Sequence, residues 1–216
     1  MTLIQFKLPP RGVFQKMGES DPLDYYYKPL IGKLYVERIN GALSLLENRQ
    51  YHKILEIGYG SGILMPTLCR IGQEVYGVDL DSDPRIVTEK LKPLNCHPIL
   101  SKGITDCLVF DKSSFDLVVA ISVLEHIKEI EDFMQEISRI IQPGGFLLVG
   151  MPRVDKAMNY LFKAIGFSVI EDHHVTTPED MLIASSSCFE QIAQSQLPNF
   201  LPSSIYLYKS FLLRKK

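Results

Sequence analysis

The sequence predicts an α/β protein with a doubly wound, mostly parallel sheet of seven strands. Three features lead to this prediction: short apolar runs typical of buried strands, helical patterns between them, and glycines or acids directly after the runs. Strands that are apolar on both faces and alternate with helices form parallel sheets covered on both sides. Right-handed crossovers make such a sheet doubly wound, and its ligands bind beyond the carboxyl ends of the strands.

The first expected elements follow an irregular arm over residues 8–24. Apolar residues at three-to-five-residue steps predict a helical region over residues 23–46, with a break or turn at Pro29. A further helix is expected from Pro84, because Asp83 can cap its first turn. Between them, apolar runs and helical periodicity predict a strand over 53–57, a helix over 63–71 and a strand over 74–78.

The second half continues the alternation as far as residue 150. The pattern predicts strands over 97–100, 115–121 and 146–150, and a helix over 130–141 that ends before Pro143-Gly144-Gly145.

The tail follows a different pattern. After an insertion over 151–176, with a helix of its own over 155–165, Thr177-Pro178 and the acids behind it have the pattern of a helix start. Two strands over 189–197 and 205–213 then indicate an antiparallel hairpin at the edge of the sheet.

The length of 216 residues suits one domain over residues 1–216. We expect it to comprise an N-terminal arm and helix (1–50), a ligand-binding core (51–151), a lid-like insertion (152–176), and a C-terminal helix and hairpin (177–216).

Charge and hydropathy limit the partners. A formal net charge of −2 with no basic stripe gives no pull toward nucleic acid, so no nucleic-acid partner is predicted. No stretch reaches the roughly 18 to 20 apolar residues that span a bilayer, and the N-terminus lacks the pattern of a secretory signal. We therefore expect a cytoplasmic protein without stable membrane insertion, while a peripheral membrane contact stays open; the oligomeric state is left undecided.

The four cysteines, Cys69, Cys96, Cys107 and Cys188, form no CxxC pair and have no metal-ligand spacing to a histidine. Four reduced thiols are expected. His173 and His174 are adjacent on an extended segment and so point to opposite sides. No metal site is predicted.

The glycine-rich turn Gly58-x-Gly60-x-Gly62 lies between an expected strand and helix. Glycines let a backbone adopt positive φ and approach a ligand closely. A dinucleotide site would favour Gly or Ala at position 63, where this chain has Ile63. The turn alone therefore indicates a nucleotide-like ligand.

Two acids refine this interpretation. Asp79 ends the second strand, where a carboxylate can accept the ribose hydroxyls of an adenosine. Glu56 precedes the first glycine, and a carboxylate there suits a ligand with a cationic amino-acid end and would repel a pyrophosphate.

Four segments in order, ILEIGYGSG, VYGVDLDSD, LVFDKSSFDLVVAISVLEHI and IIQPGGFLLVGMP, resemble the class I methyltransferases, most closely the type 11 and type 12 subgroup. The resemblance covers roughly residues 51–151, and HHVTTPEDM is similar to a later segment of that subgroup. It implies a Rossmann-like sheet of seven strands with an antiparallel last strand, and S-adenosylmethionine as the cofactor.

The resemblance also implies the residues around the cofactor. Those of the glycine turn lie by its methionine end: Glu56, Gly58, Tyr59, Gly60, Ser61 and Gly62. Asp79 binds the ribose and Leu80 packs beside the adenine. Ala120, Ile121 and Ser122 line the site. The loop Ile104-Thr105-Asp106 departs from the family pattern, because Ile104 replaces the acid that commonly meets the adenine amino group; Thr105 or Asp106 can substitute for it.

Glu125 and His126 follow Ser122 at the expected mouth for the methyl acceptor. His126 can act as a general base, or both residues can fix the loop by hydrogen bonds. Methyl transfer from a sulfonium needs no obligatory base, since positioning supplies most of the acceleration.

The sequence thus predicts a methyltransferase that acts on an oxygen, nitrogen or carbon of a small-molecule acceptor. The acceptor would enter between the 23–35 helix, Ser122 to His126 and the 151–176 insertion. Two rival hypotheses are a nicotinamide-dependent oxidoreductase, which Glu56 and Ile63 disfavour, and a catalytically silent binding module, which Ile104 favours.

Overall fold

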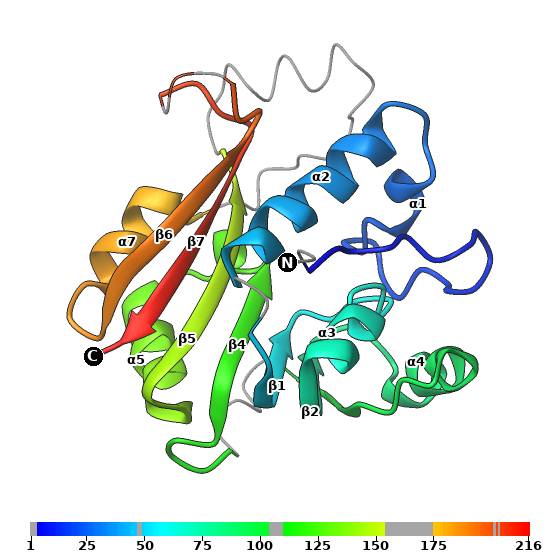
Figure 1. Ribbon diagram of the computed structural model, residues 1–216, viewed down its shortest axis with the longest axis horizontal. Coiled ribbons are helices and arrows are strands. Elements are labelled where there is room, and N and C mark those ends of the chain that lie inside the picture. Colours follow the sequence, from blue (N-terminus) through cyan, green and yellow to red (C-terminus); the bar gives the residue numbers. More distant parts are fainter. Residues whose placement is uncertain (1–3, 47–48, 104–109, 154–174, 201, 203) are drawn as a thin grey trace.

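A computed structural model describes residues 4–46, 49–103, 110–153, 175–200, 202 and 204–216. Within them lies one seven-stranded sheet in the order β3-β2-β1-β4-β5-β7-β6 (Figure 1). In this sheet β7 runs antiparallel to both of its neighbours, β5 and β6, and the pairs among β1 to β5 are parallel. The strands are β1 (Tyr51–Ile57), β2 (Gly72–Asp79), β3 (Ile99–Lys102), β4 (Phe115–Ile121), β5 (Ile141–Pro152), β6 (Phe189–Leu197) and β7 (Tyr208–Lys215). The predicted fold class is confirmed.

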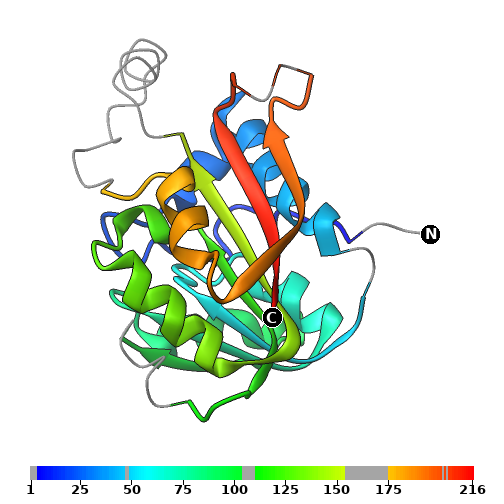
Figure 2. The same ribbon diagram turned by 90° about the vertical axis from the view of Figure 1, so that its left-hand side faces the viewer.

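Helices cover both faces of the sheet. On one face lie α2 (Ile31–Leu43), α3 (Met65–Ile71) and α4 (Pro84–Leu91), and on the other lie α5 (Ile130–Ile140) and α7 (Pro178–Ser185), which Figure 2 shows in front. A short helix α1 (Leu23–Tyr26) precedes α2, and single 3-10 turns occur at η1 (Ser44–Leu46), η2 (Lys92–Leu94) and η4 (Leu124–His126).

The sheet separates two apolar cores, because neighbouring strand residues point to opposite faces. In β4, Leu117 and Val119 face the core under α2 to α4, whereas Val118 and Ala120 face the core under α5 and α7. All four side chains are fully buried. This burial on both sides explains why the central strands are nearly continuous apolar runs in the sequence.

Several boundaries differ from expectation. The helical region over 23–46 divides at Pro29 into α1 and α2, as the proline indicated. The helix after the glycine turn begins at Met65 and β2 follows it directly at Gly72. The strand expected over 146–150 extends from Ile141 to Pro152, because Ile141 also pairs with Phe115 and a register shift separates this pair from Phe146 and Leu117. The helix expected over 155–165 lies outside the described residues.

The prediction of four reduced thiols is wrong for one pair. Cys69 of α3 and Cys96 form a disulfide with Cα atoms 5.8 Å apart. The two residues are 27 positions apart in the sequence and meet because the crossover through α4 returns beside α3, so no local spacing could indicate the pair. Cys188 is a free thiol, and Cys107 lies outside the described residues.

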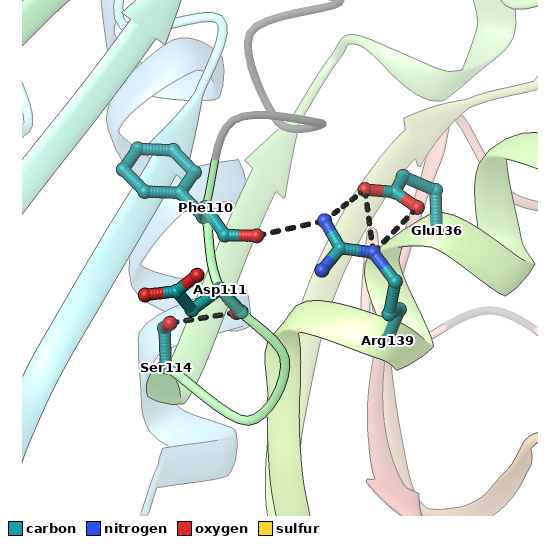
Figure 3. A network of polar contacts seen from close by, with 5 residues as sticks. All are labelled: Phe110, Asp111, Ser114, Glu136 and Arg139. Carbon is teal, nitrogen blue, oxygen red and sulfur yellow. Dashed lines mark hydrogen bonds and ion pairs between the residues drawn. The ribbon is translucent and has the colours of Figure 1, made fainter.

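A polar network fixes the loop that enters β4 (Figure 3). Arg139 of α5 is held by the carboxylate of Glu136, with contacts of 2.6 to 3.0 Å, and donates to the carbonyl oxygen of Phe110 at 2.8 Å. The Ser114 hydroxyl donates to the Asp111 carbonyl at 2.7 Å. The network lies at the amino end of β4, opposite the carboxyl end at which ligands bind on sheets of this kind.

Over the described part of the chain, we find no helix long and apolar enough to cross a membrane.

A reciprocal capping box begins α7. The Thr177 hydroxyl accepts from the Asp180 N–H at 3.1 Å, and the Asp180 carboxylate accepts from the Thr177 N–H at 3.0 Å. We expect Thr177→Ala to lower the free energy of unfolding by about 1 kcal/mol, since an orphan N–H loses its acceptor. Urea denaturation measures the change.

Ser186→Ala is the matched control, because its hydroxyl bonds the Ile183 carbonyl at the other end of the same helix. We expect its effect to stay within about 0.5 kcal/mol. Equal losses in both variants would contradict a specific role for the cap.

Candidate functional site

The glycine turn lies where β1 ends and adopts backbone angles that exclude most side chains. Gly58, Gly60 and Gly62 have φ of +76°, +51° and +81°, the left-handed region that glycine enters without penalty. A Cβ atom on Gly58 would lie 2.3 Å from Cγ2 of Val123. The turn therefore needs glycine for conformation and also for its close approach to the turn after β4.

Asp79 anchors this turn from the end of β2. One carboxylate oxygen accepts from the Gly60 N–H at 2.8 Å, and the other accepts from the N–H groups of Asp81 at 2.9 Å and Ser82 at 2.8 Å. A carboxylate offers about four acceptor positions, so Asp79 keeps capacity for a ligand hydroxyl. Its observed contacts add a structural role to the predicted one.

Glu56 is a buried acid with an unused oxygen. Its side chain is 4% exposed, and its Oε2 atom has no hydrogen-bond partner among the described residues. Burial raises the pKa of Glu56 to about 8, and the charge of Asp79 adds to the rise. A buried carboxyl group without a partner is costly, so this position is suited to a ligand that brings a donor or a positive charge.

Asp21 is a site residue that the sequence interpretation missed. It lies in the arm before α1, accepts from the N–H groups of Met17 at 2.9 Å and Leu23 at 3.0 Å, and is 8% exposed. Its carboxylate lies beside Gly60, 3.6 Å from where a Cβ atom would be. Burial raises the pKa of Asp21, and Asp79 contributes. Three carboxyl groups thus converge on the turn.

The other predicted residues that the structure describes lie in the glycine turn or at the ends of β2 and β4. Tyr59 and Ser61 are buried, and the Tyr59 hydroxyl donates to the Ser101 carbonyl at 3.3 Å. Leu80, 59% exposed, leaves an apolar surface open after β2. Ala120 is buried and Ile121 half-buried at the end of β4. Ile104, Thr105 and Asp106 lie outside the described residues, so their predicted contacts with adenine stay predictions.

The turn after β4 has a second polar cluster. Ser122 has φ of +59°, unusual for a residue other than glycine. Its hydroxyl oxygen lies 2.8 Å from Tyr208 Oη and accepts from Arg38 Nη1 at 3.2 Å. Arg38 also donates to Tyr26 Oη at 3.3 Å, and its guanidinium lies 4.0 Å from the Tyr35 ring centre.

Glu125 and His126, predicted as a catalytic pair, have different surroundings. Glu125 is 1% exposed, and its Oε2 atom has no partner in the described part of the chain. Burial raises the pKa of Glu125 to about 8, opposed by its own backbone N–H and by Arg38. His126 is exposed. The two side chains therefore do not form one buried unit, and their catalytic role stays a prediction.

Arg38 and Tyr208 were also absent from the sequence interpretation. A signal existed for Arg38, since it is a cation within the stripe of Leu34, Ile39 and Leu43 on an amphipathic helix. No such signal exists for Tyr208 in a tyrosine- and leucine-rich strand. Within the described ranges, no three histidine, cysteine or acidic side chains gather as metal ligands would.

The central part of the chain is similar to a known family of domains. Residues 55–149, from β1 to β5, match the family model described as a methyltransferase domain. Together with the strand order and the glycine turn, this match supports a class I, S-adenosylmethionine-dependent methyltransferase.

Among curated proteins, the chain is similar to the ubiquinone biosynthesis O-methyltransferase of Pelagibacter ubique, at 27% identity over 74% of this chain and 65% of that protein. It is also similar to the mitochondrial ubiquinone biosynthesis O-methyltransferase of Homo sapiens, at 34% identity over 45% of this chain and 28% of that protein. The matches thus span less than two thirds of the length of these relatives.

Solved structures confirm the fold. The N-methyltransferase NodS of Bradyrhizobium japonicum WM9, in complex with S-adenosyl-L-homocysteine, gives a TM-score of 0.63 at 18% identity, over 93% of this chain and 94% of that one. The PH0226 protein of Pyrococcus horikoshii OT3 gives a TM-score of 0.70 at 19% identity, over 91% and 97%.

The close approach of Gly58 to Val123 generates a stability prediction. We expect Gly58→Ala to lower the free energy of unfolding by about 1 kcal/mol because alanine disfavours the left-handed conformation. The overlap of the added Cβ atom with Val123 should lower it by about 1–3 kcal/mol more. Chemical denaturation of both forms measures the difference.

Gly144→Ala separates the two contributions. Gly144 also has φ of +76°, but a Cβ atom there meets nothing within 4 Å. This control variant should show the conformational cost alone. Losses of the same size in the two variants would show that the contact with Val123 is unimportant.

Proposed function

We propose that this protein binds S-adenosylmethionine at the glycine turn and transfers its methyl group to a small molecule. The observation that carries the proposal is Glu56, a buried carboxyl group with an unused oxygen beside Asp79. S-adenosylmethionine has a cationic sulfonium and an ammonium group. It would bring positive charge to the glycine turn, on which the carboxyl groups of Asp21, Glu56 and Asp79 converge.

Each end of the cofactor has matching groups. Glu56 would accept hydrogen bonds from the ammonium group, and Asp79 would accept from the ribose with its remaining capacity. Leu80 would pack beside the adenine. Arg38 would bind the carboxylate, because its Nε atom is enclosed and has no partner in the described residues, and guanidinium groups bind carboxylates well.

When bound, the cofactor supplies an activated methyl group on a sulfonium. The acceptor's lone pair forms the new bond to the methyl carbon while the carbon–sulfur bond breaks and the electron pair stays on sulfur. The protein's part is to align the two partners and exclude water. A proton that the acceptor loses would pass to exposed His126 at the mouth, or to the ionised form of Glu125, which is the minor form below pH 8 because burial raises the pKa of Glu125 to about 8.

For the methyl acceptor, the proposal goes as far as a small molecule and names no particular compound. The curated relatives named above are O-methyltransferases of ubiquinone biosynthesis, whereas NodS is an N-methyltransferase. Both names support a small-molecule acceptor, and the receiving atom, oxygen, nitrogen or carbon, is left open.

Isothermal titration calorimetry tests the cofactor. We expect saturable binding of S-adenosylmethionine and S-adenosylhomocysteine and none of NAD. Glu56→Ala and Asp79→Ala should each weaken binding at least tenfold, since each removes a charge-assisted contact.

Glu74→Ala is the matched control. Glu74 is a carboxylate on β2 at the opposite end from Asp79, where it pairs with Lys53, and its removal should leave affinity unchanged. Absent binding of both sulfur nucleosides to the wild-type chain would refute the proposal. Binding of NAD in their place would favour an oxidoreductase.

The raised pKa of Glu56 gives the binding a pH dependence. Below pH 8 the ligand-free carboxyl is mostly protonated, and an ammonium ligand favours its ionised form, so binding releases a proton. Affinity should therefore rise with pH between 6 and 7.5, by up to about tenfold per unit. Calorimetry in buffers of different ionisation enthalpy counts the released protons.

Glu56→Gln should remove most of this slope, because the amide does not titrate. A slope that is unchanged in Glu56→Gln would assign the released proton to another group.

A further inference from the structure

The reversed direction of β7 brings its first residue to the ligand edge of the sheet. Parallel strands present their last residues there, and β7 runs the other way, so Tyr208 at its start pairs with Pro152 at the end of β5. Tyr208 is 5% exposed. Tyr208, which is far from the glycine turn in the sequence, thus lies at the same edge of the sheet as the candidate site.

A missing side chain lets Tyr208 reach the neighbouring strand. A Cβ atom on Gly150 would lie 2.6 Å from Tyr208 Oη, so the phenol passes over β5 through space that only glycine leaves. Its hydroxyl ends 2.8 Å from Ser122 Oγ, at the end of β4. The Ser122 N–H donates to the Gly150 carbonyl at 2.8 Å, which ties the turn after β4 to β5.

Ser122 in turn orients Arg38. Two of the three guanidinium nitrogens donate to hydroxyl groups, Nη1 to Ser122 and Nη2 to Tyr26. The guanidinium carbon also lies 5.4 Å from the Tyr208 ring centre. These contacts hold the planar group in one orientation, with Nε as the donor that has no partner in the described residues.

We propose that Tyr208 is a positioning residue for the cofactor's amino-acid end. Its hydroxyl holds Ser122 in the left-handed conformation, Ser122 holds Arg38, and Arg38 presents its guanidinium to the ligand carboxylate. The inference rests on the proposed function, because it needs a ligand with such a carboxylate. It assigns a binding role to the antiparallel strand, which lies outside the segment that matches the methyltransferase domain model.

Two ligands distinguish this role from a general structural one. S-adenosylhomocysteine carries the amino-acid end, whereas 5′-methylthioadenosine shares the adenosine and sulfur but lacks the carboxylate. We expect Tyr208→Phe to weaken S-adenosylhomocysteine about tenfold, the size of one hydrogen bond to a charged partner. The affinity for 5′-methylthioadenosine should stay unchanged.

Two further variants sharpen the experiment. Ser122→Gly removes the hydroxyl but tolerates φ of +59°, so it should show the same selective loss of affinity for S-adenosylhomocysteine. The double variant should bind this ligand no more weakly than the weaker-binding of the two single variants, because both residues act through the same contact. Tyr27→Phe is the control, because its hydroxyl donates to the Pro9 carbonyl away from this cluster. It should leave both affinities unchanged.

The outcomes separate the two proposals. If wild-type protein binds neither ligand, the proposed function fails and this inference with it. If wild-type protein binds both ligands, two results for Tyr208→Phe would overturn the positioning role of Tyr208. One is an unchanged affinity for S-adenosylhomocysteine, and the other is an equal loss of affinity for both ligands. Neither result would affect the proposed function.

Discussion

The site depends on one carboxylate that holds the glycine turn in place. Asp79 accepts from three backbone N–H groups, one in the glycine turn and two in its own turn after β2. These bonds fix the relative position of two adjacent strand ends and keep Gly60 in a left-handed conformation. The arm before α1 then packs Asp21 against the same glycine. Three segments of the chain are thus organised around a single acidic side chain.

The same arrangement brings together acidic groups whose ionised forms are disfavoured. Asp21 and Glu56 have raised pKa values, with burial as the first cause and Asp79 as a further one. Such burial costs stability when no counter-charge is present. This cost of burying acidic groups would favour a cationic ligand over a ligand with a pyrophosphate. Positive charge relieves the cost, whereas a pyrophosphate would increase it. Binding energy is therefore available from relief of desolvation as well as from new contacts.

The sequence was informative where the chemistry is local. The glycine turn, Asp79 after its strand and the capping box at Thr177 are each contained in a few consecutive residues, and all were predictable. Asp21, Arg38 and Tyr208 come from the arm, the second helix and the antiparallel strand, and only the fold brings them to the site. The Cys69–Cys96 disulfide was missed for the same reason. What could not be predicted is tertiary proximity between segments that carry no shared pattern.

The position of β7 has a consequence for the order of folding. The strand is made after β6, yet it lies between β6 and β5. During synthesis, which proceeds from the N-terminus, β6 leaves the ribosome with no neighbour in the sheet to pair with. Residues 208–215 must emerge before β6 can join the rest. The nascent protein therefore passes through a stage in which β5 is an unpaired edge strand. When β7 pairs with β5, it covers this edge and at the same time brings Tyr208 to the site.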